Sequence, residues 1–174
     1  AKSASIASII NCGNATVLDV DVDVNVQWQG NATFKVTVTI VNNHFRDYDG
    51  RLRAFVVEKN SSLGWKDGFN KAYTNPFLDY ALNQVISVPA YTTWSTTTTW
   101  VGAQHNNGYG VTYGNITYDN IQVIAAVYND TPQQAYSKPP NGYPFTAYFA
   151  DEADGGMTDS LVADTDVLPQ SGGV

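Results

Sequence analysis

The strongest constraint on the fold is a strict alternation of apolar and polar residues near the start of the chain. From Leu18 to Trp28, hydrophobic residues occupy every second position, and Asp, Asn and Gln occupy the positions between them. Residues 33–41 alternate in the same way. A period of two places one set of side chains in a core and the other in solvent, which predicts two half-buried β-strands.

The segment between these strands sets their register. We assign the loop to residues 30–32. That length places Trp28 opposite Phe34, so that the two apolar faces coincide. A two-residue loop would put the faces on opposite sides of the sheet. We therefore expect a hairpin with a three-residue loop.

Further strands are predicted in segments rich in β-branched and aromatic residues, namely 51–58, 84–88, 92–101, 121–128, 143–150 and 158–167. One short helix is predicted near 76–83, because Asn75 can cap it, Pro76 suits its first position and apolar residues follow at helical spacing. About eight strands with almost no helix predict an all-β antiparallel sandwich of jelly-roll or immunoglobulin-like type. A closed barrel is the alternative.

The charge of the chain argues against one class of partner. Sixteen Asp and Glu against nine Lys and Arg give a net charge of -7, which repels the phosphates of nucleic acids. No apolar run approaches the roughly 20 residues that a membrane-spanning helix needs. We expect neither nucleic-acid binding nor a membrane span.

Two features indicate an extracellular or cell-surface protein. The sequence begins with Ala1 and shows no leader, as expected after removal of a signal peptide or after trimming. N-x-S/T acceptor sequences for glycosylation occur five times; Asn129 is the poorest because Pro132 follows closely. The better candidates are Asn14, Asn31, Asn60 and Asn115. The single Cys12 forbids an internal disulfide and leaves the redox compartment open.

Few groups suited to catalysis are present. The histidines are His44 and His105, and the sequence has neither a nucleophile-elbow serine nor a zinc-protease motif. The glycine-rich residues 108–114 lack the helix and spacing of a nucleotide loop, so a β-turn segment is the simpler interpretation. We expect no enzymatic activity; a hydrolase with two converging carboxylates is the open alternative.

Oxygen ligands, in contrast, are abundant, and such a composition favours Ca²⁺ over zinc or copper. Two acidic turns place carboxylates and flexible carbonyl groups within a few residues of one another. The candidate ligands are Asp47, Asp49, Asp151, Glu152, Asp154 and Asp159. The alternative is that both turns are simply solvated.

A third acidic group lies on one face of the first strand. Asp19, Asp21 and Asp23 are spaced about 6.6 Å apart along a strand, too far for all three to bind one ion. Their repulsion needs relief from cations at a contact with another molecule, or from Lys and Arg on a neighbouring strand.

Residues 1–12 form a segment with its own character. The segment has no charge after Lys2, and Ile6, Ile9 and Ile10 lie among small residues. It can form the first edge strand of its own sandwich, or it can extend into a neighbouring subunit as a donor strand. Donor strands join copies by a heterologous contact, which generates a filament or tube unless the assembly closes.

Three segments carry a resemblance to known proteins. Residues 48–58, 75–83 and 120–129 resemble the β-sandwich modules of secreted archaeal proteins, some of which are attached to a thioredoxin-like domain. The resemblance covers roughly residues 35–152 and lies mainly in core strands. Because the chain has no Cys-x-x-C, redox activity is not implied. In design the chain is also similar to the subunits of archaeal cannulae, a resemblance that implies donor-strand exchange and Ca²⁺ at subunit contacts.

Together these observations predict a non-enzymatic, extracellular structural protein whose partners are copies of itself. Residues 1–12 would be the donor strand, residues 13–174 a single sandwich domain, and the acidic turns the Ca²⁺ ligands. The alternative is a carbohydrate-binding or adhesion module in which an exposed ring such as Trp65 stacks on sugars.

Overall fold

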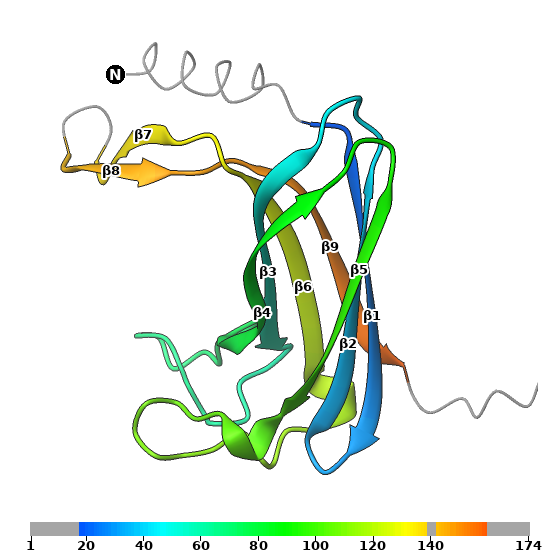
Figure 1. Ribbon diagram of the computed structural model, residues 1–174. Coiled ribbons are helices and arrows are strands. Elements are labelled where there is room, and N and C mark those ends of the chain that lie inside the picture. Colours follow the sequence, from blue (N-terminus) through cyan, green and yellow to red (C-terminus); the bar gives the residue numbers. More distant parts are fainter. Residues whose placement is uncertain (1–17, 139–141, 160–174) are drawn as a thin grey trace, which may run out of the picture.

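The computed structural model describes residues 18–138 and 142–159, and these residues form an all-β fold (Figure 1). Seven strands form one sheet: β1 (Val20–Gly30), β2 (Thr33–Asn42), β3 (Tyr48–Glu58), β4 (Phe77–Val88), β5 (Thr93–Val101), β6 (Ile121–Asn129) and β9 (Ala150–Asp159). Two more strands, β7 (Gln133–Tyr136) and β8 (Pro144–Ala147), pair with each other as a projecting arm. The all-β prediction is confirmed.

Helical structure in the described ranges is limited to two 3₁₀ turns, η1 (Gly102–Gln104) and η2 (Tyr118–Asn120). Neither turn has the length or the apolar character of a membrane-spanning helix. The strand predicted over residues 158–167 overlaps only the end of β9, and the rest of that segment lies outside the described residues.

The order of strands across the main sheet is β4-β3-β6-β9-β1-β2-β5. Neighbouring strands are antiparallel except β1 and β9, which pair in parallel and so correct the expectation of a fully antiparallel arrangement. The sheet curls toward a barrel, and its edge strands β4 and β5 approach each other without a ladder of hydrogen bonds in the described residues. The fold therefore approaches the barrel that was the alternative to a sandwich.

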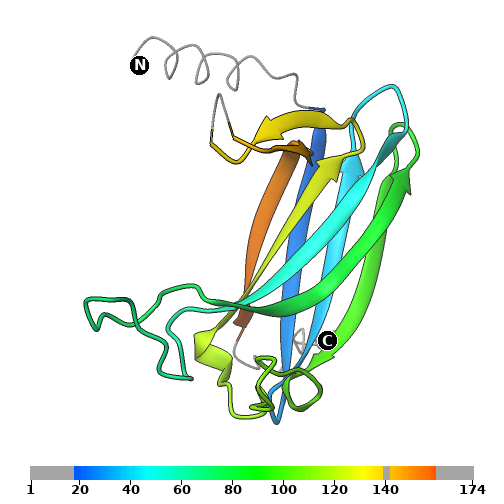
Figure 2. The same ribbon diagram turned by 90° about the vertical axis from the view of Figure 1, so that its left-hand side faces the viewer.

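The two ends of the curled sheet differ in what they carry (Figures 1 and 2). At the end that we call the entry end, uppermost in Figure 1, the described chain begins at Leu18, and the β2–β3 loop, the β4–β5 connection and the arm lie there. At the opposite exit end lie the β1–β2 turn, the long loops before β4 and before β6, and the end of β9.

The core lies on the concave side of the sheet, and its side chains are most completely buried along the central strands. The alternating residues of β2, β3 and β6 are fully buried there, among them Phe34, Val38, Leu52 and Val123. Their burial follows from the period-two pattern, because each strand turns every second side chain inward.

The first hairpin has the predicted register but a different loop. Trp28 pairs with Phe34, as expected. The loop itself is the two residues Asn31 and Ala32, which both have positive φ, near 50°, as a type I′ turn requires. Gln29 is bulged between Trp28 and Gly30, so the extra residue that keeps the apolar faces together lies in the strand and not in the loop.

The helix predicted near 76–83 is wrong, because residues 77–88 form β4. Two bulges interrupt the pairing of β4 with β3. Each bulge adds one residue to the period of two, so the buried and half-buried positions Leu78, Ala81 and Leu82 acquire a spacing that imitates a helix. Asn75 has a φ of 52° and not the extended φ of a helix N-cap.

Candidate functional site

The two edge strands face each other across a seam where the core is incompletely covered. On β5, Trp94, Thr96 and Thr98 lie on the core face, because each pairs directly with a fully buried residue of β2. All three are only half-buried. On β4, Leu82 and Gln84 pair with buried residues of β3 and are half-buried as well. We refer to these five residues as the seam.

A buried asparagine ties the seam at the entry end. Asn42, the last residue of β2, is 0% exposed. Its Nδ2 donates to the carbonyl oxygens of Val88 and Arg46, each at 2.9 Å, and lies 3.2 Å from that of Pro89. Its Oδ1 accepts from the backbone N–H of His44 at 2.9 Å. One side chain thus joins the end of β2, the β2–β3 loop and the end of β4.

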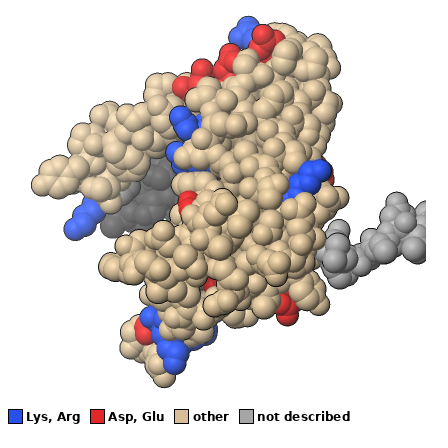
Figure 3. Space-filling view, turned by 60° about the horizontal axis from the view of Figure 1, so that its bottom comes forward, with Lys and Arg blue, Asp and Glu red and all other residues tan. Residues whose placement is uncertain are grey.

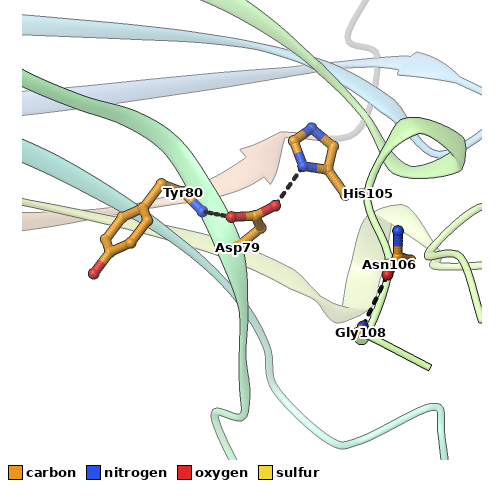
Figure 4. Close-up of polar contacts among 5 residues, drawn as sticks. All are labelled: Asp79, Tyr80, His105, Asn106 and Gly108. Carbon is orange, nitrogen blue, oxygen red and sulfur yellow. Dashed lines mark hydrogen bonds and ion pairs between the residues drawn. The ribbon is translucent and has the colours of Figure 1, made fainter. Parts of the chain in front are cut away.

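A hydrogen bond between a carboxylate and a histidine links the two sides of the seam at the exit end (Figure 4). Asp79 Oδ2 on β4 lies 2.6 Å from His105 Nδ1, just after η1, and Asp79 Oδ1 accepts from the backbone N–H of Tyr80 at 2.7 Å. The imidazole stacks on Trp100, with ring centroids 4.6 Å apart and planes 13° apart. Trp100 stacks in turn on Phe34. We call Asp79 and His105 the clasp.

Buried ionisable groups surround the clasp. Glu58 is 0% exposed, and its carboxylate accepts from the backbone N–H of Ser62 at 3.0 Å and from Asn120 Nδ2 at 3.3 Å. Burial of Tyr113, together with the negative charges of Asp79 and Glu58, raises the pKa of its phenol. Tyr113 therefore stays protonated at neutral pH.

A histidine and a carboxylate are two members of a hydrolytic triad, whose third member is a hydroxyl or thiol bonded to the histidine. Among the described residues no hydroxyl or thiol hydrogen-bonds to His105. The ring instead packs face to face on Trp100. The arrangement supports a structural tie between β4 and the segment after β5.

The predicted metal ligands converge in part at the entry end. Asp47 precedes β3 and Asp49 lies within it, and both line a pocket of about 420 Å³ together with Asp130, which follows β6. Asp47 Oδ1 also accepts from the backbone N–H of Ala90 at 2.9 Å. Sequence reasoning missed Asp130, because only the pairing of β3 with β6 brings it beside Asp49; the available signal was a carboxylate directly after the most apolar strand.

Asp151 reaches the same end from the core side. It is 7% exposed, and its carboxylate accepts from the Tyr48 hydroxyl at 3.0 Å and from Asn129 Nδ2 at 3.1 Å. Burial of Tyr48, followed by the charges of Asp151 and Asp130, raises the pKa of the phenol far above its ordinary value. Both oxygens of Asp151 are therefore engaged in an internal network that joins β3, β6 and β9.

The remaining predicted ligands lie farther along β9. Glu152 is exposed, and Asp154 Oδ2 accepts from the backbone N–H of Val24 at 3.1 Å, which links β9 to β1. Asp159 ends β9, and its side chain is not among those described. Within the described ranges, no three side chains of His, Cys, Asp or Glu are grouped as a metal site requires.

Other predicted residues divide between the described part and the rest. The donor-strand residues Ile6, Ile9 and Ile10, together with Cys12 and Asn14, lie outside the described residues. The glycosylation candidates Asn31, Asn60 and Asn115 are exposed, and all three lie at the exit end. The neighbouring carboxylates Asp19 and Asp21 share the amide of Asn43, which donates to Asp21 Oδ2 at 2.8 Å.

Comparisons with known proteins show no family. No family model and no curated protein matches the chain. One similar solved structure is the GH3 beta-glucosidase of Bifidobacterium adolescentis, with 13% identity and a TM-score of 0.38 over 82% of this chain and 17% of that one. Another is the X-ray structure of the Northeast Structural Genomics Consortium target SoR45, with 14% identity and a TM-score of 0.35 over 84% of this chain and 91% of that one. Likenesses at this level carry no argument about function.

Proposed function

We propose that this protein is an extracellular structural subunit that assembles into a filament or tubule by donor-strand complementation. In this proposal, residues 1–12 of one copy insert into the seam of the next copy. The observation that carries the proposal is the incomplete cover of the core along the seam, where five core-facing side chains remain half-buried.

The seam suits an added strand in its hydrogen bonding and in its side chains. β4 and β5 are the two edges of the sheet, so each has backbone groups that an inserted strand can pair with. Trp94 and Leu82 offer apolar surface there, and Thr96 and Thr98 offer hydroxyl groups. Residues 1–12 combine isoleucines with serines and alanines in a similar mixture.

Burial of isoleucine favours the contact. Burying one isoleucine side chain contributes about 1.5–3 kcal/mol, which offsets part of the cost of association. Of Ile6, Ile9 and Ile10, alternation along a strand places Ile6 and Ile10 on one face and Ile9 on the other. Backbone pairing along the strand adds to this contribution and fixes its register. The halves β4-β3-β6-β9 and β1-β2-β5 would then act as the two layers of the predicted sandwich, with the donor strand between their edges.

The proposal also includes a Ca²⁺ ion, bound at the entry end. Asp47, Asp49 and Asp130 line one pocket, although they are not grouped as closely as a complete metal site requires. Ca²⁺ takes six to eight oxygen ligands, more than these carboxylates supply alone. We therefore place the ion at a contact between subunits, where a neighbouring copy completes its coordination.

The assembly test compares two double substitutions in the same segment. Ile6→Asp combined with Ile10→Asp places charge on the strand face that meets the seam, and the control Ser3→Asp with Ser5→Asp adds the same charge on the opposite face. We expect the control to polymerise and the isoleucine variant to remain monomeric in negative-stain microscopy and light scattering. A peptide of residues 1–12 should raise the Tm of the isoleucine variant, and a scrambled peptide should not. Equal polymerisation of both variants would contradict the proposal.

The calcium test uses substitutions at opposite ends of the molecule. Asp49→Asn with Asp130→Asn removes two charges from the entry-end pocket, and the control Asp119→Asn removes an exposed charge on η2. We expect a chelator to dissolve wild-type polymer, and the double variant to need more Ca²⁺ for assembly than the control. Polymer that persists without Ca²⁺ would remove the ion from the proposal and leave the donor strand in place.

A further inference from the structure

A second hollow lies on the outer face of the sheet, away from the seam. It is a cleft of about 480 Å³ between the arm and the outer face of β3 and β6, within the roughly 300–1,000 Å³ typical of small-molecule sites. Figure 3 shows the hollow between the arm and the body, with basic atoms at its border. Six of its lining residues matter for what it can bind: Arg51, Arg53, Tyr128, Asn129, Asp130 and Tyr148.

The two arginines of the cleft have no acidic partner in the described part of the chain, and the same holds for its other Lys and Arg residues. The guanidinium of Arg53 lies over the ring of Tyr128, 5.2 Å from its centroid, and its Nε is buried without a hydrogen-bond partner among the described residues. Arg51 Nη1 donates to Asn83 Oδ1 at 3.0 Å. Both guanidinium groups are held by neutral side chains.

Two of the nine Lys and Arg residues of this acidic chain line one cleft. No Lys or Arg of the described structure is paired with a carboxylate, so it is their shared position in a cleft that distinguishes Arg51 and Arg53. A guanidinium presents a planar fork of donors that matches a carboxylate. The cleft therefore favours a ligand that brings a carboxylate with it.

The other lining groups narrow the ligand class. The ring of Tyr148 is 50% exposed, and tyrosine rings pack well against the apolar faces of sugars. The Asn129 amide bonds to Asp151 and to the backbone N–H of Thr131, and its second N–H is available to a ligand, whereas Asp130 accepts hydrogen bonds from hydroxyl groups. An acidic peptide offers Tyr148 no sugar ring and Asp130 no series of hydroxyl groups, so it uses only part of this combination. A ring with one carboxylate and several hydroxyl groups fits it well.

From these contacts we propose that the cleft binds a uronate residue of an acidic polysaccharide. The carboxylate pairs with Arg51 and Arg53, the sugar ring packs against Tyr148, and the hydroxyl groups hydrogen-bond to Asn129 and Asp130. The cleft lies on the outer face of the sheet and the seam on its core side, so this proposal is independent of the donor strand, and it shares Asp130 with the calcium pocket. A structural subunit with such a site would hold acidic polysaccharide along the surface of its polymer.

The test is calorimetric titration of the full chain with trigalacturonate, and with the same trisaccharide as its methyl ester. We expect binding of the acid, and loss of about ten-fold or more in affinity for the ester, because esterification removes the charge that the arginines recognise. Equal binding of acid and ester, or absence of binding at millimolar acid, would overturn the proposal. Tighter binding of a tri-glutamate peptide would replace the sugar by an acidic peptide and so overturn it too.

Matched variants locate the site. Arg53→Gln keeps much of the side chain and removes its charge, and Tyr148→Ala removes an exposed ring whose loss leaves the core intact. The control is Arg46→Gln, because Arg46 also lies over an aromatic ring, that of Phe45 at 5.0 Å, but outside the cleft. We expect both cleft variants to lose about ten-fold or more in affinity and the control to bind as wild type. An equal loss in the control would show attraction by charge alone and would overturn the assignment.

Discussion

Three buried or half-buried polar side chains each link separate strands of this molecule. Asn42 joins β2 to the end of β4, Asp154 joins β9 to β1, and Asp151 joins three neighbouring strands. A buried polar group that loses its partner costs about 1–3 kcal/mol, whereas an exposed one costs little. These residues therefore contribute more to stability than their number suggests.

Replacing Asn42 by alanine should lower the free energy of unfolding by about 2–3 kcal/mol, because buried carbonyl oxygens at the end of β4 lose their donor. The adjacent Asn43→Ala is the control, since Asn43 is exposed and bonds only to exposed carboxylates in the described structure. It should change stability by about 0.5 kcal/mol or less. Urea unfolding followed by circular dichroism measures both values; similar losses for the two variants would refute the role given to Asn42.

The raised pKa of Tyr48 predicts that the free energy of unfolding falls at alkaline pH. Burial and Asp151 raise the pKa of its phenol above the value near 10 of an unfolded chain, so the folded state keeps a proton that the unfolded state releases. Stability from this group is fully present below pH 10 and falls as the pH rises above it. Tyr48→Phe should be about 1–2 kcal/mol less stable at pH 8, because Asp151 loses a donor.

The difference between wild type and Tyr48→Phe should then shrink by about 1.4 kcal/mol for each pH unit above 10. Urea unfolding at several pH values between 8 and 11 gives the two curves. The other ionisable groups titrate in both proteins, so their contributions cancel in the difference. A difference that stays constant over this range would show that Tyr48 does not titrate differently in the two states.

At the level of strands, alternation in the sequence was sufficient where pairing is regular and failed where bulges interrupt it. The first hairpin could be predicted in register because its bulge, at Gln29, lies next to the turn, so the pattern is unbroken up to Trp28 and from Phe34 onward. β4 could not, since its two bulges are stabilised by β3, a partner that the sequence of β4 does not reveal. The clasp could not be predicted either, because Asp79 and His105 are 26 positions apart and meet only through the curl of the sheet.

The junction of β9 with β1 depends on a glycine. A Cβ on Gly156 would lie 2.6 Å from the carbonyl oxygen of Val24, whereas one on Gly155 would meet only the flexible end of Gln122 at 3.0 Å. Gly156→Ala should therefore cost about 1–3 kcal/mol, and Gly155→Ala should cost clearly less. Thermal unfolding of the two variants tests the comparison. Equal Tm values would show that β9 can move away from β1 at Gly156 without loss of stability.

The clasp predicts a local effect on one strand edge. His105→Ala removes the partner of Asp79, so amide hydrogen exchange should accelerate in β4 near residues 77–82, with a loss of about 1 kcal/mol in local stability. His44→Ala is the matched control, because His44 lies at the opposite end and its ring contacts the exposed Phe45 in a tilted arrangement. Exchange that accelerates equally in both variants, or in neither, would contradict the role of the clasp.

For the whole molecule, the sequence sufficed for the strand content but not for the closure of the sheet. Alternation, turn residues and the absence of long helical patterns predict an all-β chain, and the structure confirms it. Whether the sheet curls toward a barrel depends on which strands become neighbours, above all on the pairing of β1 with β9, which lie far apart in the sequence. Likewise, the acidic turns were visible as composition, but only the folded chain brings Asp130 beside Asp49.

The parallel junction of β1 and β9 has a mechanical consequence. β1 starts at the entry end and β9 finishes at the exit end, so a pull on the chain at these two points slides the strands lengthwise past each other. In that shearing geometry the ladder bonds of the junction and the Asp154–Val24 bond carry the load together, and do not open one by one as in an unzipped hairpin. The fold therefore resists a force applied between the start of β1 and the end of β9 more strongly than it would if the strands opened one bond at a time. Such resistance is useful to a protein that bears force between these two points.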